Sequence, residues 1–339
     1  MERLFTENGY KRIHIITVDH IIEYRVSKKQ KLLMTKTDNT AANAESTALK
    51  HSMDHDKEKI YLLKEGMPVL PLIDLGVFTK DFHIIKAKYY KFKQINSFLR
   101  NIVSGIDQNI KGALRIIEFG CGKSYLTFIL YYYFAYIKKI NVEITGYDKD
   151  CGVVDLCNNV ARKYQYENLK FIEGDVSQIA GLSGQSHGNA DMLITLHACD
   201  TATDHALYYA VKNKVRYIFC VPCCQQEINA QIKRAGESSR AAFNALLRYG
   251  LYKERFSALL TDCIRCETLN DNGYYVDVVE FIGEENTPKN AMIRARYTGH
   301  TKNYGAAVKE LTSLFGIEQT LLKLMEEADL IKNRRENVE

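Results

Sequence analysis

Residues 118–124, with the sequence EFGCGKS, decide the fold of this chain. They end a short apolar run, Leu114–Phe119, and lead into a second apolar run that begins at Tyr125. Glycines between a strand and a helix let the backbone turn tightly and approach a ligand closely. The pattern therefore predicts a strand–loop–helix unit with a ligand site at the loop.

Beyond this loop, short apolar runs alternate with helical patterns. Such alternation is typical of a parallel sheet that helices cover on both faces. The predicted strands are Leu114–Phe119, Glu143–Tyr147, Leu169–Glu173, Asp191–Leu196 and Tyr217–Val221. Near the end, Phe256–Leu260 and Tyr274–Phe281 are predicted to form a strand pair joined by a polar turn at 270–273, and the tail from Ala306 is predicted to be helical.

The first third of the chain has a different character. Residues 10–36 alternate apolar and polar side chains, which predicts two or three antiparallel strands, and residues 37–59 are predicted to be a loop with one helix. From Ile84 to Val103 the apolar residues recur at helical spacing. Four lysines lie largely off that apolar face: Lys86, Lys88, Lys91 and Lys93.

Composition excludes several classes of protein. Only 20 Gly and 4 Pro in 339 residues exclude a collagen-like chain. No apolar run approaches the roughly 20 residues of a membrane helix. The first twelve residues carry charges but no apolar core, so we expect no secretory signal. We therefore expect a cytoplasmic protein with no membrane partner, whose nine cysteines are free thiols.

Charge is unevenly distributed. The net charge is +5, but residues 1–111 hold 19 Lys and Arg against 13 Asp and Glu, whereas the remainder is close to neutral. This asymmetry indicates a polyanionic partner for the first third.

Acidic residues end three of the predicted strands. Glu118 lies where a dinucleotide would place its pyrophosphate, so its carboxylate suits a ligand with an ammonium group instead. Asp148 lies where a carboxylate accepts hydrogen bonds from ribose hydroxyls, and Asp175, 27 residues farther on, is placed to accept from an adenine amino group. S-adenosylmethionine has an ammonium group, a ribose and an adenine but no phosphate, so it fits all three positions.

With these motifs the sequence resembles the class I S-adenosylmethionine-dependent methyltransferases over residues 86–298. LHACDTATD at 196–204 and VPCCQ at 221–225 are similar to a subgroup of uncharacterised bacterial methyltransferases, which also includes transfer-RNA ribose methyltransferases of the Trm-thirteen type. The resemblance implies an α/β, doubly wound, Rossmann-like sheet of seven strands with an antiparallel last strand. It also implies a cofactor site lined by Glu118, Gly120, Gly122, Asp148, Asp175, Val176 and Leu196. Many members have a third glycine where this chain has Ser124.

The resemblance places two loops beside the reacting groups. His197, Cys199 and Asp200 follow the fourth strand, and His197 or Asp200 is predicted to orient or deprotonate the acceptor. Cys223 follows the fifth strand. For Cys199, Cys223 and Cys224 three interpretations stay open: buried packing, a role in the substrate pocket that includes covalent catalysis by Cys223, and zinc binding together with His197. Adjacent cysteines are poor spacing for a structural zinc site, so no residue is assigned as a metal ligand. Cys263 and Cys266 are predicted to lie on a loop between strands.

The expected activity is methyl transfer from S-adenosylmethionine to RNA, at a ribose hydroxyl or a base of transfer or ribosomal RNA. RNA is expected to bind the basic N-terminal third and Lys86, Lys88, Lys91 and Lys93, with Tyr89, Tyr90 and Phe92 stacking on bases. The alternatives are a small-molecule or protein methyltransferase, a nicotinamide-dependent oxidoreductase and a non-catalytic RNA-binding module. The predicted division is a basic α+β domain (1–83), a basic connecting helix (84–111), the methyltransferase domain (112–298) and a helical extension (299–339).

Overall fold

The computed structural model describes residues 12–16, 20–26, 32–38, 61–110, 112–181, 190–196, 198–234, 243, 247–281, 290–301 and 305–330. The chain divides into two compact units, residues 1–60 and 61–339. The predicted boundaries after residues 83, 111 and 298 divide the chain more finely than this and stay predictions.

The first unit contains a three-stranded antiparallel sheet in the order β1-β2-β3. Its strands are β1 Arg12–Ile16, β2 His20–Val26 and β3 Leu32–Asp38. The antiparallel strands predicted for residues 10–36 are thus present. The helix predicted within residues 37–59 lies outside the described residues, which resume at residue 61.

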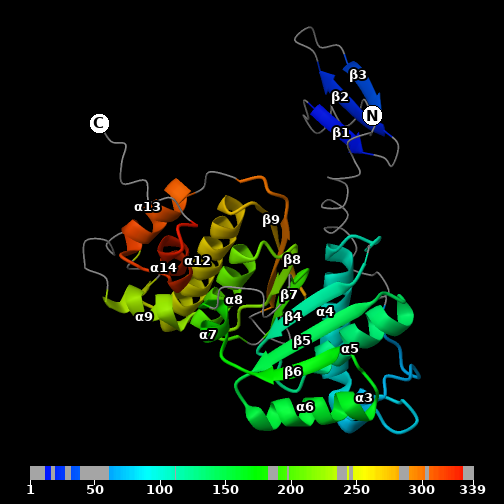
Figure 1. Cartoon of the computed structure of the whole chain (residues 1–339). Helices are drawn as coiled ribbons and strands as arrows, with labels where there is room; N and C mark the ends of the chain where they lie inside the picture. The colour runs from blue at the N-terminus through cyan, green and yellow to red at the C-terminus, as the bar shows by residue number, and fades with distance from the viewer. Residues whose placement is uncertain are drawn as a thin grey trace. The chain divides into compact units, whose positions relative to one another are not determined.

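The second unit is built on a seven-stranded sheet in the order β6-β5-β4-β7-β8-β10-β9 (Figure 1). The strands are β4 Leu114–Phe119, β5 Val142–Asp148, β6 Leu169–Glu173, β7 Met192–Thr195, β8 Tyr217–Cys220, β9 Tyr274–Glu280 and β10 Ala291–Tyr297. Strands β4 to β8 pair in parallel, and β10 is antiparallel to both β8 and β9. The predicted fold class, with its antiparallel last strand, is confirmed.

Helices cover both faces of this sheet. The described helices of this unit are α3 Pro71–Asp74, the 3-10 turn η1 Lys86–Lys88, α4 Tyr89–Gly105, α5 Tyr125–Tyr131, the π-helical turn η2 Tyr132–Ile137, α6 Cys151–Lys163, α7 Val176–Gly181, α8 Thr201–Lys212, α9 Gln226–Arg234, α12 Gly250–Asp271, α13 Gly305–Phe315 and α14 Thr320–Glu327. Of these, α9 and α13 pack with α12 in a separate apolar core. Successive strand residues point to opposite faces, so Ile116 belongs to the apolar core that contains residues of α4, α5 and α6, and Ile117 to the core that contains residues of α7, α8 and α14. Phe92 of α4 is buried in the first of these cores, so the prediction that it stacks on bases is wrong. Within the described part of the chain, no helix has both the length and the apolar character needed to cross a membrane.

Helix α12 corrects one prediction. Phe256–Leu260, predicted to be a strand, lies within this 22-residue helix, and the partner of β9 is β10. The buried face of α12 is largely polar, and the hydroxyls of Ser257, Thr261 and Thr268 each donate to the carbonyl four residues earlier. These local bonds satisfy polar groups inside the protein, so the buried face of α12 does not show apolar residues at helical spacing. Cys263 and Cys266 consequently lie on a helix and not on the predicted loop.

Candidate functional site

The glycine loop forms a tight turn against β5. Gly120 and Gly122 have φ values of 70° and 51°, and Ser124 has a φ of 53° directly before α5. The amides of Gly120 and Cys121 both donate to the carbonyl of Tyr147. A left-handed backbone favours glycine, and the Ser124 hydroxyl, which donates to the Gly122 carbonyl at 3.1 Å, stabilises the turn with a side chain in its place.

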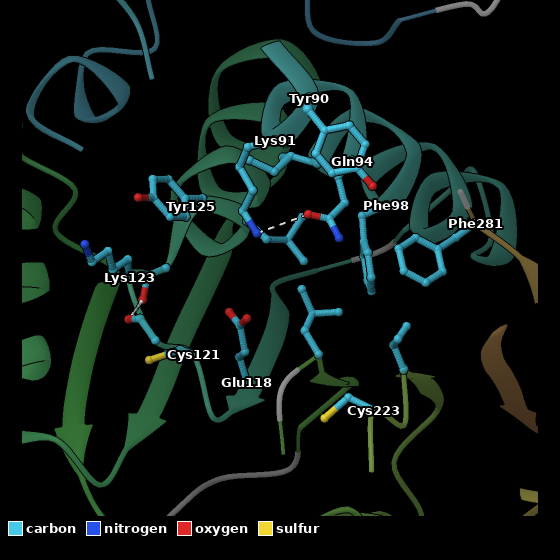
Figure 2. A pocket seen from close by; sticks show the side chains of 16 residues that line it. Tyr90, Lys91, Gln94, Phe98, Glu118, Cys121, Lys123, Tyr125, Cys223 and Phe281 are labelled. Atoms are coloured by element: carbon cyan, nitrogen blue, oxygen red, sulfur yellow. Dashed lines mark hydrogen bonds between the residues drawn. The ribbon is translucent and has the colours of Figure 1, made fainter. Parts of the chain in front are cut away.

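A cavity of about 460 Å³ lies beside this loop (Figure 2). Helix α4 contributes Tyr90, Lys91, Gln94, Ile95 and Phe98, and the glycine loop with the start of α5 contributes residues 121–126. The ends of three parallel strands supply Glu118, Leu196, Val221 and Cys223, and Phe281 completes the lining. In Figure 2 the charged side chains Lys91, Lys123 and Glu118 lie on one side and the rings of Phe98 and Phe281 on the other.

Glu118 places a buried carboxyl group in this cavity. Its side chain is 2% exposed and accepts a hydrogen bond of 2.5 Å from the Thr127 hydroxyl. Burial, with a smaller contribution from the nearby charge of Asp148, raises the pKa of Glu118 to about 7. No cation pairs with it among the described residues. A carboxyl group in this position favours a ligand cation and opposes a pyrophosphate, which disfavours the nicotinamide alternative.

Lys91 brings an ammonium group into the same cavity. It donates to Gln94 Oε1 at 3.2 Å, and its Nζ lies 5.7 Å from the centre of the Tyr125 ring. Burial, and to a lesser extent the charge of Lys88, lowers the pKa of Lys91. In the described part of the chain no carboxylate pairs with it. The sequence predicts that Lys91 binds RNA, because the place of this residue in the cavity lining follows only from the fold.

Glu118 and Lys91 together match the amino-acid end of S-adenosylmethionine. Glu118 would hold the ammonium group and Lys91 the carboxylate, since each charged group would then meet its opposite at a site that is at least partly buried. When bound, this cofactor supplies an electrophilic methyl group on a sulfonium.

The two other acidic strand ends lie outside the cavity lining. Asp148 accepts from the amides of Gly122 at 2.7 Å and Asp150 at 3.1 Å. Asp175 accepts from the amide and hydroxyl of Ser177, and its ion pair with Lys149 at 2.8 Å is the main reason that its pKa falls to about 2. Each carboxylate still has lone pairs for a ligand, so Asp148 would hold the ribose and Asp175 the adenine. The predicted cofactor residue Val176 is buried at the start of α7.

The predicted catalytic residues are not all brought together. Cys223 lines the cavity, as does the predicted cofactor residue Leu196, whereas Cys199 and Asp200 do not, and His197 lies outside the described residues. Both carboxylate oxygens of Asp200 accept from the amide of Glu227 at 3.1 Å, next to the start of α9. This places Asp200 in a link between the two loops after β7 and β8.

The cysteines after β7 and β8 converge. Cys199 Sγ lies 3.1 Å from Cys223 Sγ and 3.7 Å from Cys224 Sγ. Burial raises the pKa of Cys223 to about 12, with a further increase from Cys199. Covalent catalysis needs a thiolate, so this environment by itself disfavours the predicted nucleophilic role of Cys223.

Comparisons with known proteins agree with the fold. Residues 90–231 match a protein family described as a methyltransferase domain. The search of curated proteins found no match.

The chain is also similar to solved structures of methyltransferases. A Podospora anserina methyltransferase with bound S-adenosylhomocysteine is 14% identical, with a TM-score of 0.36, over 77% of this chain and 97% of that one. Magnesium protoporphyrin IX methyltransferase from Synechocystis PCC 6803 is 15% identical, with a TM-score of 0.35, over 61% of this chain and 82% of that one.

The family match and the carboxyl groups at the strand ends lead to the same conclusion. The glycine loop, the unpaired buried carboxyl group and the acidic strand ends suit a cofactor that carries an ammonium group and a ribose. The predicted enzyme class and cofactor are confirmed: the chain carries an S-adenosylmethionine-dependent methyltransferase domain.

Proposed function

We propose that this domain methylates RNA in the cytoplasm, at a ribose hydroxyl or a base. The observation that carries the proposal is the position of Tyr90, which lines the cavity and is still 42% exposed. A ring at the mouth of a methyl-transfer site is placed to stack on an unpaired base, the usual way in which proteins read single-stranded RNA.

The surroundings of Tyr90 support a polyanionic substrate. Lys86, Lys88 and Lys93 are exposed on the same stretch of chain, and Lys93 Nζ lies 4.7 Å from the centre of the Tyr89 ring. These cations would neutralise phosphates on either side of the base that enters the cavity. The basic N-terminal third adds to this attraction, and the similarity of LHACDTATD and VPCCQ to transfer-RNA ribose methyltransferases favours the same substrate.

In this function the protein would act mainly by positioning. Methyl transfer from a sulfonium is an in-line displacement, so the acceptor must approach on the axis of the breaking bond. Tyr90 and the lysines would fix the nucleotide, and the predicted loop residue His197 would take up the proton of a hydroxyl acceptor.

The test is a tritium-transfer assay with labelled S-adenosylmethionine on separated RNA, protein and small-molecule fractions. We expect label in RNA, a steep loss of RNA binding with salt, and a large loss of transfer in Y90A. The triple variant K86M/K88M/K93M should lower the salt slope, whereas the control K170M/K214M/K309M, at exposed lysines elsewhere, should keep it. Label only in the protein or small-molecule fraction would refute the RNA substrate and leave the methyltransferase assignment intact.

A further inference from the structure

Three cysteines from two loops form one thiol cluster. Cys199 follows β7, Cys223 and Cys224 follow β8, and their sulfur atoms all lie within 4.8 Å of one another. In a tetrahedral site with Zn–S bonds of about 2.3 Å, sulfur atoms are roughly 3.8 Å apart. The separation between Cys199 and Cys224, 3.7 Å, matches this value. Cys199 and Cys223 are closer, at 3.1 Å, and need to move apart by only a fraction of an ångström to share one ion.

Packing does not explain this cluster. Cys121, Cys157, Cys220 and Cys266 are buried, as isolated cysteines usually are. Cys199, in contrast, is exposed, and Cys223 and Cys224 are half-buried. Sulfur atoms that gather where water reaches them contribute little as hydrophobic groups, so a different role is needed.

Adjacent cysteines are able to face one partner here because their segment is not a strand. Strand β8 ends at Cys220, and residues 221–225 belong to no helix or strand. The alternation that points neighbouring side chains to opposite faces therefore does not apply. This removes the objection that their spacing raised in the sequence.

The two loops are held together from behind. The Asp200 carboxylate accepts from the Glu227 amide, and Arg265 Nη2 donates to the Asp200 carbonyl at 2.9 Å. Arg265 also pairs with Asp262, which accepts from Gln225 Nε2 at 3.2 Å. Residues next to Cys199 and Cys224 are thus fixed to one buried network, which keeps the three sulfur atoms in place, as a metal site requires.

We propose that Cys199, Cys223 and Cys224 bind one Zn²⁺ ion. Thiolates are the ligands that zinc accepts most readily together with imidazole. Three protein ligands leave the fourth position for water or a substrate atom, as in catalytic zinc sites. Because Cys223 lines the cavity, the ion would lie at the side of the methyl-transfer site and polarise an acceptor oxygen or sulfur there.

The test measures metal and not methyl transfer, so its outcome is independent of the RNA proposal. The full chain, purified with a phosphine reductant and without chelators, is analysed for zinc by mass spectrometry. We expect one zinc per chain in the wild type and in the control C263S, whose exposed thiol lies outside the cluster. We expect loss of the metal in C199S, C223S and C224S. Substitution with Co²⁺ should give the intense visible and near-ultraviolet bands of tetrahedral thiolate coordination.

Two results would overturn the proposal. The first is a wild-type chain that stays free of zinc and shows no thiolate bands after addition of Zn²⁺ or Co²⁺. This result is obtained with the wild type alone, so it does not depend on whether the variants fold. The second is a disulfide that contains Cys199 in the wild type isolated without reductant. It would appear as two free thiols fewer than the nine cysteines when the denatured chain is titrated.

Discussion

Arg265 and Asp204 form a bidentate ion pair inside the second unit. Nε donates to Oδ1 at 2.9 Å and Nη2 to Oδ2 at 2.8 Å, and the two side chains are 0% and 1% exposed. The same guanidinium donates from Nη1 to Asp262 at 2.9 Å. The pair joins α8 to α12 directly behind the loops that carry the thiol cluster, so its loss affects both stability and the site.

R265M should lower the free energy of unfolding by about 3–5 kcal/mol, because it leaves the carboxylate of Asp204 buried and uncompensated. Urea denaturation followed by circular dichroism measures this loss. The control K323M removes an exposed ion pair with Glu318 and should leave the midpoint unchanged. Equal effects of the two variants would contradict the role given to the buried pair.

D148A should weaken binding of S-adenosylhomocysteine by about 1.5–3 kcal/mol, the usual effect of losing hydrogen bonds to a charged group. The carboxylate also fixes the Gly122 amide. D148N keeps an acceptor for that amide and should lose less affinity. Calorimetric titration measures both variants, and unchanged affinity in D148A would mean that the ribose binds elsewhere.

Glu118 should make both stability and cofactor binding depend on pH. Its folded pKa of about 7 exceeds the ordinary value of 4.5, so between these values the folded chain holds a proton that the unfolded chain has released. The free energy of unfolding therefore falls as pH rises through this window, by up to about 3 kcal/mol.

E118Q should abolish that slope in urea titrations without cofactor. A bound ammonium group stabilises the ionised carboxylate, so affinity for S-adenosylhomocysteine should decline below about pH 7 in the wild type and stay flat in E118Q. A parallel pH dependence in the two proteins would show that Glu118 does not meet the ammonium group.

Much of the fold could be predicted because its signals are local. The five parallel strands are short apolar runs, and the glycine loop marks the turn between β4 and α5. Helix α12 could not be predicted in this way. The partner of Arg265, Asp204, lies 61 residues away in the sequence. The buried hydroxyls of the helix bond to its own backbone, so they leave no apolar pattern.

The same distinction between local and long-range signals applies to the residues of the candidate site. Glu118 was recognisable from its place near the end of a predicted strand, and Gly122 and Cys223 from their places after predicted strands. Lys91 was not, because its position on a basic helix says nothing about which lysine points into a cavity. The position of Asp200 likewise predicted a catalytic group, whereas its bonds to Glu227 depend on a helix that starts 26 residues later.

The most direct test of the account compares two ligands by calorimetry. S-adenosylhomocysteine carries the amino-acid end that Lys91 and Glu118 would hold, and methylthioadenosine lacks it. K91M should lose at least about tenfold in affinity for S-adenosylhomocysteine, or about 1.4 kcal/mol, and bind methylthioadenosine as the wild type does. The control K93M, on the same helix but outside the cavity lining, should bind both ligands normally. Wild-type affinity of K91M for S-adenosylhomocysteine, or an equal loss for both ligands, would contradict the site described.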